Sequence, residues 1–236
     1  MPRAIVPVAM ILAAGRGERM RPLTDHVPKA LLSVGGKPLI FWHLEKLASA
    51  GFKRVVVNHA HLGEQIEAAV GDGSRWQLSV LYSREPEALE TAGGLRNAQP
   101  LLDSEAFAVV NADVFSDYAY TGLRRALSDL TPNGNQAHLV MVDNPPHHPR
   151  GDFGIRNGQS VLNSQPLMTF GGLSAFRAQV FEQVPRGHKQ ALAPLLREQI
   201  ALGKIGAEHY RGLWIDVGTP QRLAELDALL LRPGVR

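Results

Sequence analysis

The chain has 236 residues, of which 44% are hydrophobic and 20% charged, with 23 Gly, 16 Pro and no Cys. This balance is that of a globular protein, and it excludes a disordered chain, a collagen and a disulfide scaffold. The formal net charge is only +3 and the basic residues are scattered, so nucleic acid is not expected as a partner. The lack of Cys also excludes a thiolate nucleophile and a Cys-based zinc site.

The N-terminal apolar run, Ala4–Ala14, is interrupted by Pro7 and passes directly into a Gly-containing turn. The run is too short to cross a bilayer. Cleavage near Ala13, as in a signal peptide, would remove a strand that the following motif needs. We therefore expect a cytoplasmic protein without a membrane partner.

In the first half of the chain, short runs of Val, Ile and Leu alternate with helical patterns, which is typical of βαβ units around a mostly parallel sheet. The helices are predicted to end at turn residues, as Gly51 follows one and Gly71 another. Strands are predicted at Ala4–Leu12, Lys53–Asn58, Leu78–Tyr82 and Phe107–Asn111, and helices at Pro38–Ala50, His61–Val70 and Gly93–Leu101.

The second half continues the alternation but contains a region of short segments around residues 144–176, which indicates a small antiparallel insertion or a sheet edge. Its predicted parts are the loop Asn144–Arg150 and the segments Asp152–Arg156, Ser160–Leu162 and Met168–Phe176. The other predicted elements are helices near Tyr120–Leu130, Gln190–Leu202 and Pro220–Leu231, and strands at Ala137–Val142 and Leu213–Val217. We predict one α/β domain over residues 1–236, with a Rossmann-like, mixed and mostly parallel sheet flanked by helices.

A Gly-containing loop follows the first predicted strand and begins Ala13-Ala14-Gly15-Arg16-Gly17-Glu18-Arg19. Because Gly has no Cβ, such a loop can bring backbone N–H groups against phosphates or a base. The loop is not a Walker A motif, and Met20 occupies the third glycine position of a dinucleotide fingerprint. Taken alone, the pattern equally fits a surface turn with solvated arginines.

A second candidate is Thr91-Ala92-Gly93-Gly94, a turn that opens a predicted helix. Helix N-termini and glycine turns bind anions or polar base edges, whereas simple capping by Thr91 is the alternative.

Two acids form the third candidate, because each follows a predicted strand. Asp113 comes after the apolar run Phe107–Asn111, and Asp216 lies in the sequence Trp214-Ile215-Asp216-Val217-Gly218-Thr219. Ligands of open α/β sheets collect at the carboxyl ends of strands. Mg²⁺ prefers few protein oxygens together with phosphates and water, so the pair could hold this ion. Taken singly, each acid is as readily a cap or a turn residue.

The segment Ala13–Thr24 reads small-small-Gly-x-Gly-x-Arg-x-x-Pro-x-Thr, and Pro28-Lys29 follows downstream. This string resembles the signature loop of the sugar-1-phosphate nucleotidyltransferases, and the resemblance extends from Ala9 to about Leu230. It implies that Arg19 and Lys29 neutralise the triphosphate and act in catalysis. The nucleotide-binding residues that it implies are Ala13, Ala14, Gly15, Gly17, Glu18, Thr91 and Gly93, although many members have Thr at the position of Glu18. It further implies that Asp113 and Asp216 bind Mg²⁺ and that Asn111 and Asp152 bind the sugar phosphate.

Three further segments, Val142–Pro145, Arg150–Phe153 and Glu208–Gly212, resemble the members of this family that use UTP and N-acetylmuramate 1-phosphate in peptidoglycan recycling. The reaction so implied is transfer of a nucleotidyl group to a sugar 1-phosphate, with release of pyrophosphate, by a monomer. Another acceptor (glucose, mannose or heptose 1-phosphate, phosphocholine or a molybdopterin) and a non-catalytic nucleotide-sugar sensor are the alternatives, and a Rossmann dehydrogenase is the weakest. The neighbouring His147 and His148 are interpreted as solvated or packed rather than as metal ligands.

Overall fold

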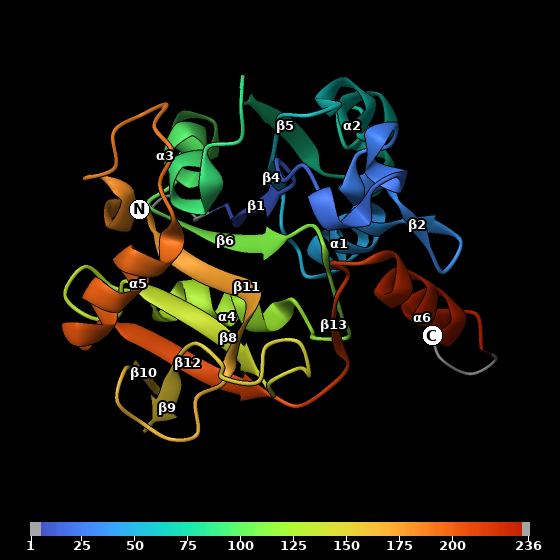
Figure 1. The fold of residues 1–236 in the computed structure, drawn as a ribbon. Helices are drawn as coiled ribbons and strands as arrows, with labels where there is room; N and C mark the ends of the chain where they lie inside the picture. Colours follow the sequence, from blue (N-terminus) through green and yellow to red (C-terminus); the bar gives the residue numbers. More distant parts are fainter. Residues whose placement is uncertain (1–5, 233–236) are drawn as a thin grey trace.

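The computed structural model describes residues 6–232, so the first two residues of the predicted strand Ala4–Leu12 lie outside the described part. A nine-stranded sheet runs through the molecule with helices on both faces (Figure 1). The strands are β1 (Val8–Leu12), β2 (Ser33–Val34), β3 (Lys37–Pro38), β4 (Arg54–His59), β5 (Ser79–Arg84), β6 (Ala106–Asn111), β7 (Val114–Ser116), β8 (Ala137–Val142), β9 (Gly154–Arg156), β10 (Gln159–Val161), β11 (Thr169–Arg177), β12 (Ile205–Tyr210) and β13 (Trp214–Asp216). The α-helices are α1 (Leu39–Ser49), α2 (Gly63–Val70), α3 (Glu90–Leu102), α4 (Thr121–Asp129), α5 (Leu192–Ala201) and α6 (Pro220–Leu230).

The main sheet has the order β5-β4-β1-β6-β11-β8-β12-β10-β9. Strands β5, β4, β1 and β6 are parallel to one another, and β8 is parallel to β12. Only β11 separates the two groups, and it is antiparallel to both of its neighbours, β6 and β8. The predicted fold class, a mixed and mostly parallel sheet flanked by helices, is therefore confirmed.

The position of β11 corrects one prediction. Residues 144–176 were expected to form an insertion or a sheet edge, and β9 and β10 do lie at the edge. The last segment of that range instead forms β11, a central strand with buried residues on both faces. Its neighbours in the sheet are β6 and β8, which are distant in sequence, so local pattern alone could not place it.

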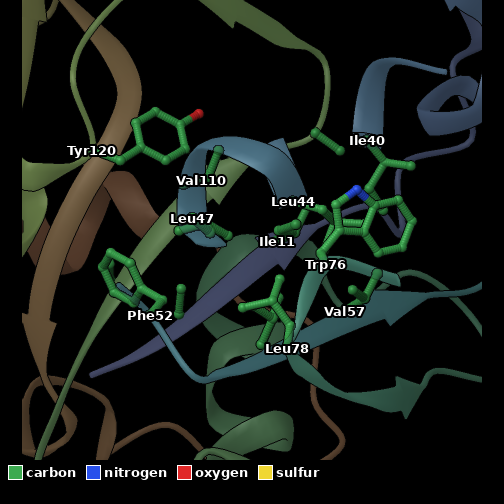
Figure 2. Close-up of a cluster of buried hydrophobic side chains, with 14 of the residues drawn as sticks. Ile11, Ile40, Leu44, Leu47, Phe52, Val57, Trp76, Leu78, Val110 and Tyr120 are labelled. Atoms are coloured by element: carbon green, nitrogen blue, oxygen red, sulfur yellow. The ribbon is translucent and has the colours of Figure 1, made fainter. Parts of the chain in front are cut away.

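Alternating residues of the parallel strands enter two cores, as expected for side chains that point to opposite faces of a sheet. In β1, Ala9 and Ile11 pack in one core with α1, α2 and α4, whereas Val8 and Met10 pack in the other with α3 and α5. Figure 2 shows the first core, where Leu44 and Leu47 of α1 lie near Ile11. Burial on both faces fixes the sheet, and hence the positions of its strand ends.

The carboxyl ends of β1, β4, β5, β6, β8 and β12 lie along one edge of the sheet, because β11 reverses direction between β6 and β8. Next to this edge, β13 pairs with β7, and α6 packs against them through a small core that includes Phe115 and Leu226. Helix α6 begins as predicted, with Pro220 in its first turn and the Thr219 side chain accepting a hydrogen bond from the Arg222 backbone N–H. Between residues 6 and 232, no helix combines the length and the apolar character that crossing a membrane requires.

Candidate active site

A pocket of about 200 Å³ opens at the carboxyl ends of β1 and β6. Residues predicted from the sequence contribute much of its wall: Ala13, Gly15, Lys29, Thr91, Asn111 and Asp113. Leu12, Ala30 and Ala112 complete the lining. The structure thus brings together groups from four separate segments of the sequence. A larger cavity, of about 340 Å³, lies elsewhere, between α5 and the segment Gln179–Pro185.

Beyond the residues that line the pocket, the first loop is held by hydrogen bonds between its own residues. Gly17 has a φ of +70°, a left-handed conformation that favours glycine. Its carbonyl accepts a hydrogen bond from the Thr24 hydroxyl at 2.9 Å, and Arg16 donates to the Thr24 carbonyl. The Glu18 carboxylate is 66% exposed and lies beside Arg16 and Arg21, away from the pocket-lining residues. Ala14 is half-buried, but it is also outside the pocket lining.

Two buried side chains that the sequence analysis did not single out join the two candidate nucleotide segments. The Asn58 Oδ1 accepts a hydrogen bond from the Ala13 backbone N–H at 2.9 Å, and its Nδ2 donates to Glu85 Oε1 at 2.7 Å. The other oxygen of Glu85 accepts from the Leu89 backbone N–H, immediately before α3. Burial raises the pKa of the Glu85 carboxyl above its ordinary value. These two side chains fix the separation between the first loop and the start of α3.

A signal for Asn58 was present in the sequence, since this residue ends the predicted apolar strand Lys53–Asn58 at the edge where ligands of α/β sheets bind. Glu85 carries no such signal, because it lies beyond the predicted strand Leu78–Tyr82 and directly after β5. What the sequence does not show is that the two side chains meet, because that depends on the pairing of β4 with β5.

The start of α3 differs from its prediction. The helix begins at Glu90 rather than at Gly93, so the glycine pair lies inside its first turn. The Gly93 backbone N–H donates to the Gln190 carbonyl at 3.1 Å, and a Cβ on Gly93 would come within 2.3 Å of the His188 carbonyl oxygen. Close packing of the segment before α5 therefore explains this glycine. Of the two predicted residues, Thr91 is the one that lines the pocket.

The acids Asp113 and Asp216 lie on neighbouring backbone segments. The Val217 N–H donates to the Asp113 carbonyl oxygen at 2.8 Å, where β13 pairs with β7. Asp113 Oδ2 accepts a hydrogen bond from Lys29 Nζ at 2.5 Å. Asp216 Oδ2 accepts from Arg222 and also contacts His147, each at 3.2 Å. Both acids are thus at one place although 102 residues separate them in the chain.

Arg19 lies on the Asp216 side of the site. A Cβ on Gly218 would come within 3.0 Å of Arg19 Nη2 and 3.1 Å of Asp216 Oδ1, so all three are close neighbours. The same Cβ would collide with Arg222 at 2.1 Å. The two arginines and Lys29 surround the acid pair with positive charge, as needed where a polyphosphate binds.

Asn111 and Asp152 occupy different surroundings. Asn111 lines the pocket, whereas both oxygens of Asp152 are engaged within the protein. One accepts from the Phe170 backbone N–H at 2.8 Å, and the other contacts His148 at 3.1 Å. In this structure Asp152 secures the start of β11, and its predicted contact with substrate remains a prediction.

The acid pair fits a magnesium ion. In each carboxylate the hydrogen bonds go to Oδ2, and Oδ1 accepts none from residues 6–232. Hard oxygen donors, few in number, are what Mg²⁺ selects. The described part of the chain has no cluster of three or more His, Cys, Asp or Glu side chains suited to a metal.

The fold and the site together define a class of protein that binds a nucleotide at the carboxyl edge of an α/β sheet. Residues 8–163 match the family model described as nucleotidyl transferase, and the chain belongs to this family. The chain is 49% identical to the N-acetylmuramate alpha-1-phosphate uridylyltransferase of Neisseria meningitidis, over 94% of this chain and 97% of that protein. It is 30% identical to the protein of the same name from Caulobacter vibrioides, over 94% of this chain and 96% of that one.

The fold is also that of solved structures at low sequence identity. The structure of HddC from Yersinia pseudotuberculosis, complexed with GMP-PN, superimposes with a TM-score of 0.76 at 19% identity. The match covers 94% of this chain and 99% of that chain. The family resemblance predicted from the loop Ala13–Thr24 and from Pro28-Lys29 is confirmed.

Proposed function

We propose that the protein transfers the uridylyl group of UTP to N-acetylmuramate 1-phosphate, giving UDP-N-acetylmuramate and pyrophosphate. The single observation that carries the substrate choice is the 49% identity with the Neisseria uridylyltransferase along nearly the whole of both chains. The pocket supports the chemistry, because Lys29, Asn111 and Asp113 converge in it.

In the proposed reaction, an oxygen of the sugar phosphate attacks the α-phosphorus of UTP in line. The new phosphorus–oxygen bond forms as the bond between the α-phosphorus and the oxygen that bridges to the β-phosphate breaks. Pyrophosphate then leaves with that oxygen. The attacking phosphate is already ionised, so no general base is needed. Lys29 and Arg19 hold the phosphates and offset the charge on the leaving pyrophosphate, so the protein acts by alignment and electrostatics.

We propose Mg²⁺ as the cofactor, held by Asp113 and Asp216. Bound there, it would supply positive charge to the phosphates of both substrates. Lys29 holds Asp113 in place through the 2.5 Å ion pair, and Arg222 holds Asp216. The protein's own residues thus set the position of both carboxylates.

The remaining parts of the proposal concern context. UTP is a cytoplasmic metabolite, so we propose that the reaction takes place in the cytoplasm. Because its product is an activated cell-wall sugar, we propose a role in peptidoglycan recycling. We propose that the protein acts as a monomer without a nucleic-acid or membrane partner, in keeping with its small net charge of +3 and its scattered basic residues.

The test is pyrophosphate release with Mg²⁺ over a grid of substrates. UTP, dTTP, GTP, CTP and ATP are each paired with the 1-phosphates of N-acetylmuramate, N-acetylglucosamine, glucose and mannose. We expect turnover to be highest for UTP with N-acetylmuramate 1-phosphate. Turnover in another combination would replace the proposed substrates while keeping the reaction. Nucleotide binding without turnover in any combination would instead indicate a nucleotide-sugar sensor.

A further inference from the structure

A loop beside the acid pair is held in place by contacts between histidine and carboxylate side chains. The loop, residues 143–152, follows β8 and lies beside the segment that joins β12 to β13 (Figure 1). At its start Asp143 contacts His209, in its middle His147 contacts Asp216, and near its end His148 contacts Asp152. We name it the histidine loop. Because it touches both the end of β12 and Asp216, it links residues 209–211 with the acid pair.

A relay of three side chains orients Arg211 at the other side of this loop. Arg211 Nε donates a hydrogen bond to His209 Nδ1 at 3.3 Å. An arginine N–H can only donate, so Nδ1 acts as the acceptor and the proton of the imidazole is on Nε2. That Nε2–H then donates to Asp143 Oδ1 at 2.8 Å. The relay uses one nitrogen of the Arg211 guanidinium and leaves its two terminal amino groups for another partner.

The charge of Arg211 is not offset by an acid in the described residues. Arg211 is exposed and takes part in no ion pair within residues 6–232, whereas Arg222, next to the acid pair, is bound to Asp216. Asp143, the acid of the relay, contacts His209 instead. A planar guanidinium with two unengaged amino groups matches the geometry of a carboxylate.

The proposed acceptor carries two separate anions. Its phosphate must reach the acid pair, and its lactyl ether, at O3 of the sugar, ends in a carboxylate. N-acetylglucosamine 1-phosphate has the same sugar and phosphate but a hydroxyl at O3. Lysine and arginine residues near the acid pair serve the phosphates, so the lactyl carboxylate needs a cation further out on the acceptor side.

We propose that Arg211, oriented by His209 and Asp143, pairs with the lactyl carboxylate and selects N-acetylmuramate 1-phosphate over N-acetylglucosamine 1-phosphate. The inference rests on the proposed function. It assigns to the segment Glu208–Gly212 a role in choosing the acceptor, which the reaction chemistry itself does not require. A residue that binds only the lactyl substituent affects discrimination between the two acceptors and leaves the chemical step unchanged.

The experiment compares kcat/KM for the two acceptors at saturating UTP, in the unchanged protein and in Arg211→Gln. Loss of a charged hydrogen-bond pair predicts a fall of about tenfold to a hundredfold with N-acetylmuramate 1-phosphate. With N-acetylglucosamine 1-phosphate the value stays unchanged, and so does the KM for UTP. Arg211→Lys keeps the charge and recovers part of the loss, whereas His209→Gln gives a smaller loss in the same direction.

Arg156→Gln is the matched control. Arg156 is also exposed, and in the sheet it lies opposite Gln159, which in turn lies opposite Gly206. Gly206 is near the beginning of β12, whereas Arg211 follows the end of that strand, so the two arginines are well separated. Its replacement removes one positive charge and leaves both acceptors unaffected.

Three results would overturn the role of Arg211. It fails if Arg211→Gln lowers kcat/KM equally for both acceptors, since that indicates general support of the fold, or if the variant changes neither. If the unchanged protein does not use N-acetylmuramate 1-phosphate but does use another sugar phosphate, the proposed function itself fails and takes this inference with it. The first two results leave the proposed function standing.

Discussion

The two halves of the sheet hold their polar groups in different ways. In the half proposed to bind the nucleotide, which comprises β5, β4, β1 and β6 and is called the nucleotide half, the joining side chains are buried, with Asn58 2% and Glu85 5% exposed. In the half proposed to bind the acceptor, which comprises β8, β12, β10 and β9 and is called the acceptor half, the contacts of the histidine loop lie at the surface, where the side chains of His148 and Asp143 are 42% and 78% exposed.

This difference has a physical consequence. A buried polar group costs free energy unless it is hydrogen-bonded, so the buried pair tolerates few arrangements and holds the nucleotide segments rigidly. Exposed ion pairs contribute about 1 kcal/mol or less each, so the histidine loop can change without loss of the fold. The half proposed to bind the nucleotide is therefore held in a fixed geometry, and the surface contacts of the half proposed to bind the acceptor are easier to change.

The largest effect is expected where the two halves meet. Replacing Asp113 by Asn removes a charge from the proposed Mg²⁺ site, and turnover with UTP should fall by about a thousandfold. Asp216→Asn, on the other side of the same site, should behave alike. Asp117→Asn, an exposed acid close by, is the control. Full activity of Asp113→Asn in Mg²⁺ would remove Asp113 from the proposed mechanism.

The next effect concerns the positive charge that is proposed to face the triphosphate. Lys29→Ala should lower kcat by about a hundredfold to a thousandfold, because this side chain is only 12% exposed and places its ammonium group beside Asp113 in the pocket. Single-turnover kinetics would locate the loss in the chemical step. Lys189→Ala is the control: the Lys189 side chain is 53% exposed, and its replacement should leave kcat unchanged. Unchanged turnover of the Lys29 variant would give this lysine a structural role only.

The buried pair offers a direct test of rigidity in the nucleotide half. Glu85 accepts two hydrogen bonds, and Gln in its place has one acceptor oxygen, so one donor is left unpaired at a cost of about 1–3 kcal/mol. Urea denaturation should show this loss for Glu85→Gln, and steady-state kinetics should show a higher KM for UTP with a smaller change in kcat. Glu87→Gln, 68% exposed, is the control. Wild-type stability of Glu85→Gln would contradict a rigid nucleotide half.

A smaller loss is expected from the acceptor half. Asp152→Ala leaves the Phe170 backbone N–H without its acceptor, which should cost about 1 kcal/mol in the free energy of unfolding. The KM for the sugar phosphate should rise while that for UTP stays constant. A matching rise in both KM values would show that the halves are not independent.

The smallest effect depends on pH. A hydrogen bond from Arg84 lowers the pKa of Glu67 from 4.5 to about 2, with a further contribution from His59. The folded-state pKa lies below the unfolded one, so this carboxylate adds stability above pH 4.5 that is lost as the pH falls towards 2. Arg84 is 75% exposed, which keeps the contribution below about 1 kcal/mol. Thermal unfolding of Glu67→Gln should therefore depend less on pH in this range than that of the unchanged protein, and an identical dependence would rule out the pair.

Several features followed from the sequence because they depend on neighbouring residues. The apolar run before Asp113 predicted both a buried strand and a carboxylate at its end, and the last helix was predicted to begin at Pro220, where α6 does begin. Short-range periodicity and capping are encoded locally, so such elements can be found without knowing the fold. The helix Glu90–Leu102 begins three residues earlier than predicted, and Gly93 in its first turn packs against His188 and Gln190, which are distant in the sequence.

Other features were decided by the tertiary structure. The apolar pattern of Thr169–Arg177 suits an edge strand as well as a central one, and only the long-range pairing with β6 and β8 places it between them. Asn58 and Glu85 meet because β4 and β5 are adjacent and parallel, and Lys29 meets Asp113 across 84 residues of chain. Residue type and local pattern thus determined which groups could bind a nucleotide. Which of them share one pocket was decided by sheet order, because the pocket lies at the ends of β1 and β6, which are distant in the sequence and adjacent only in the folded sheet.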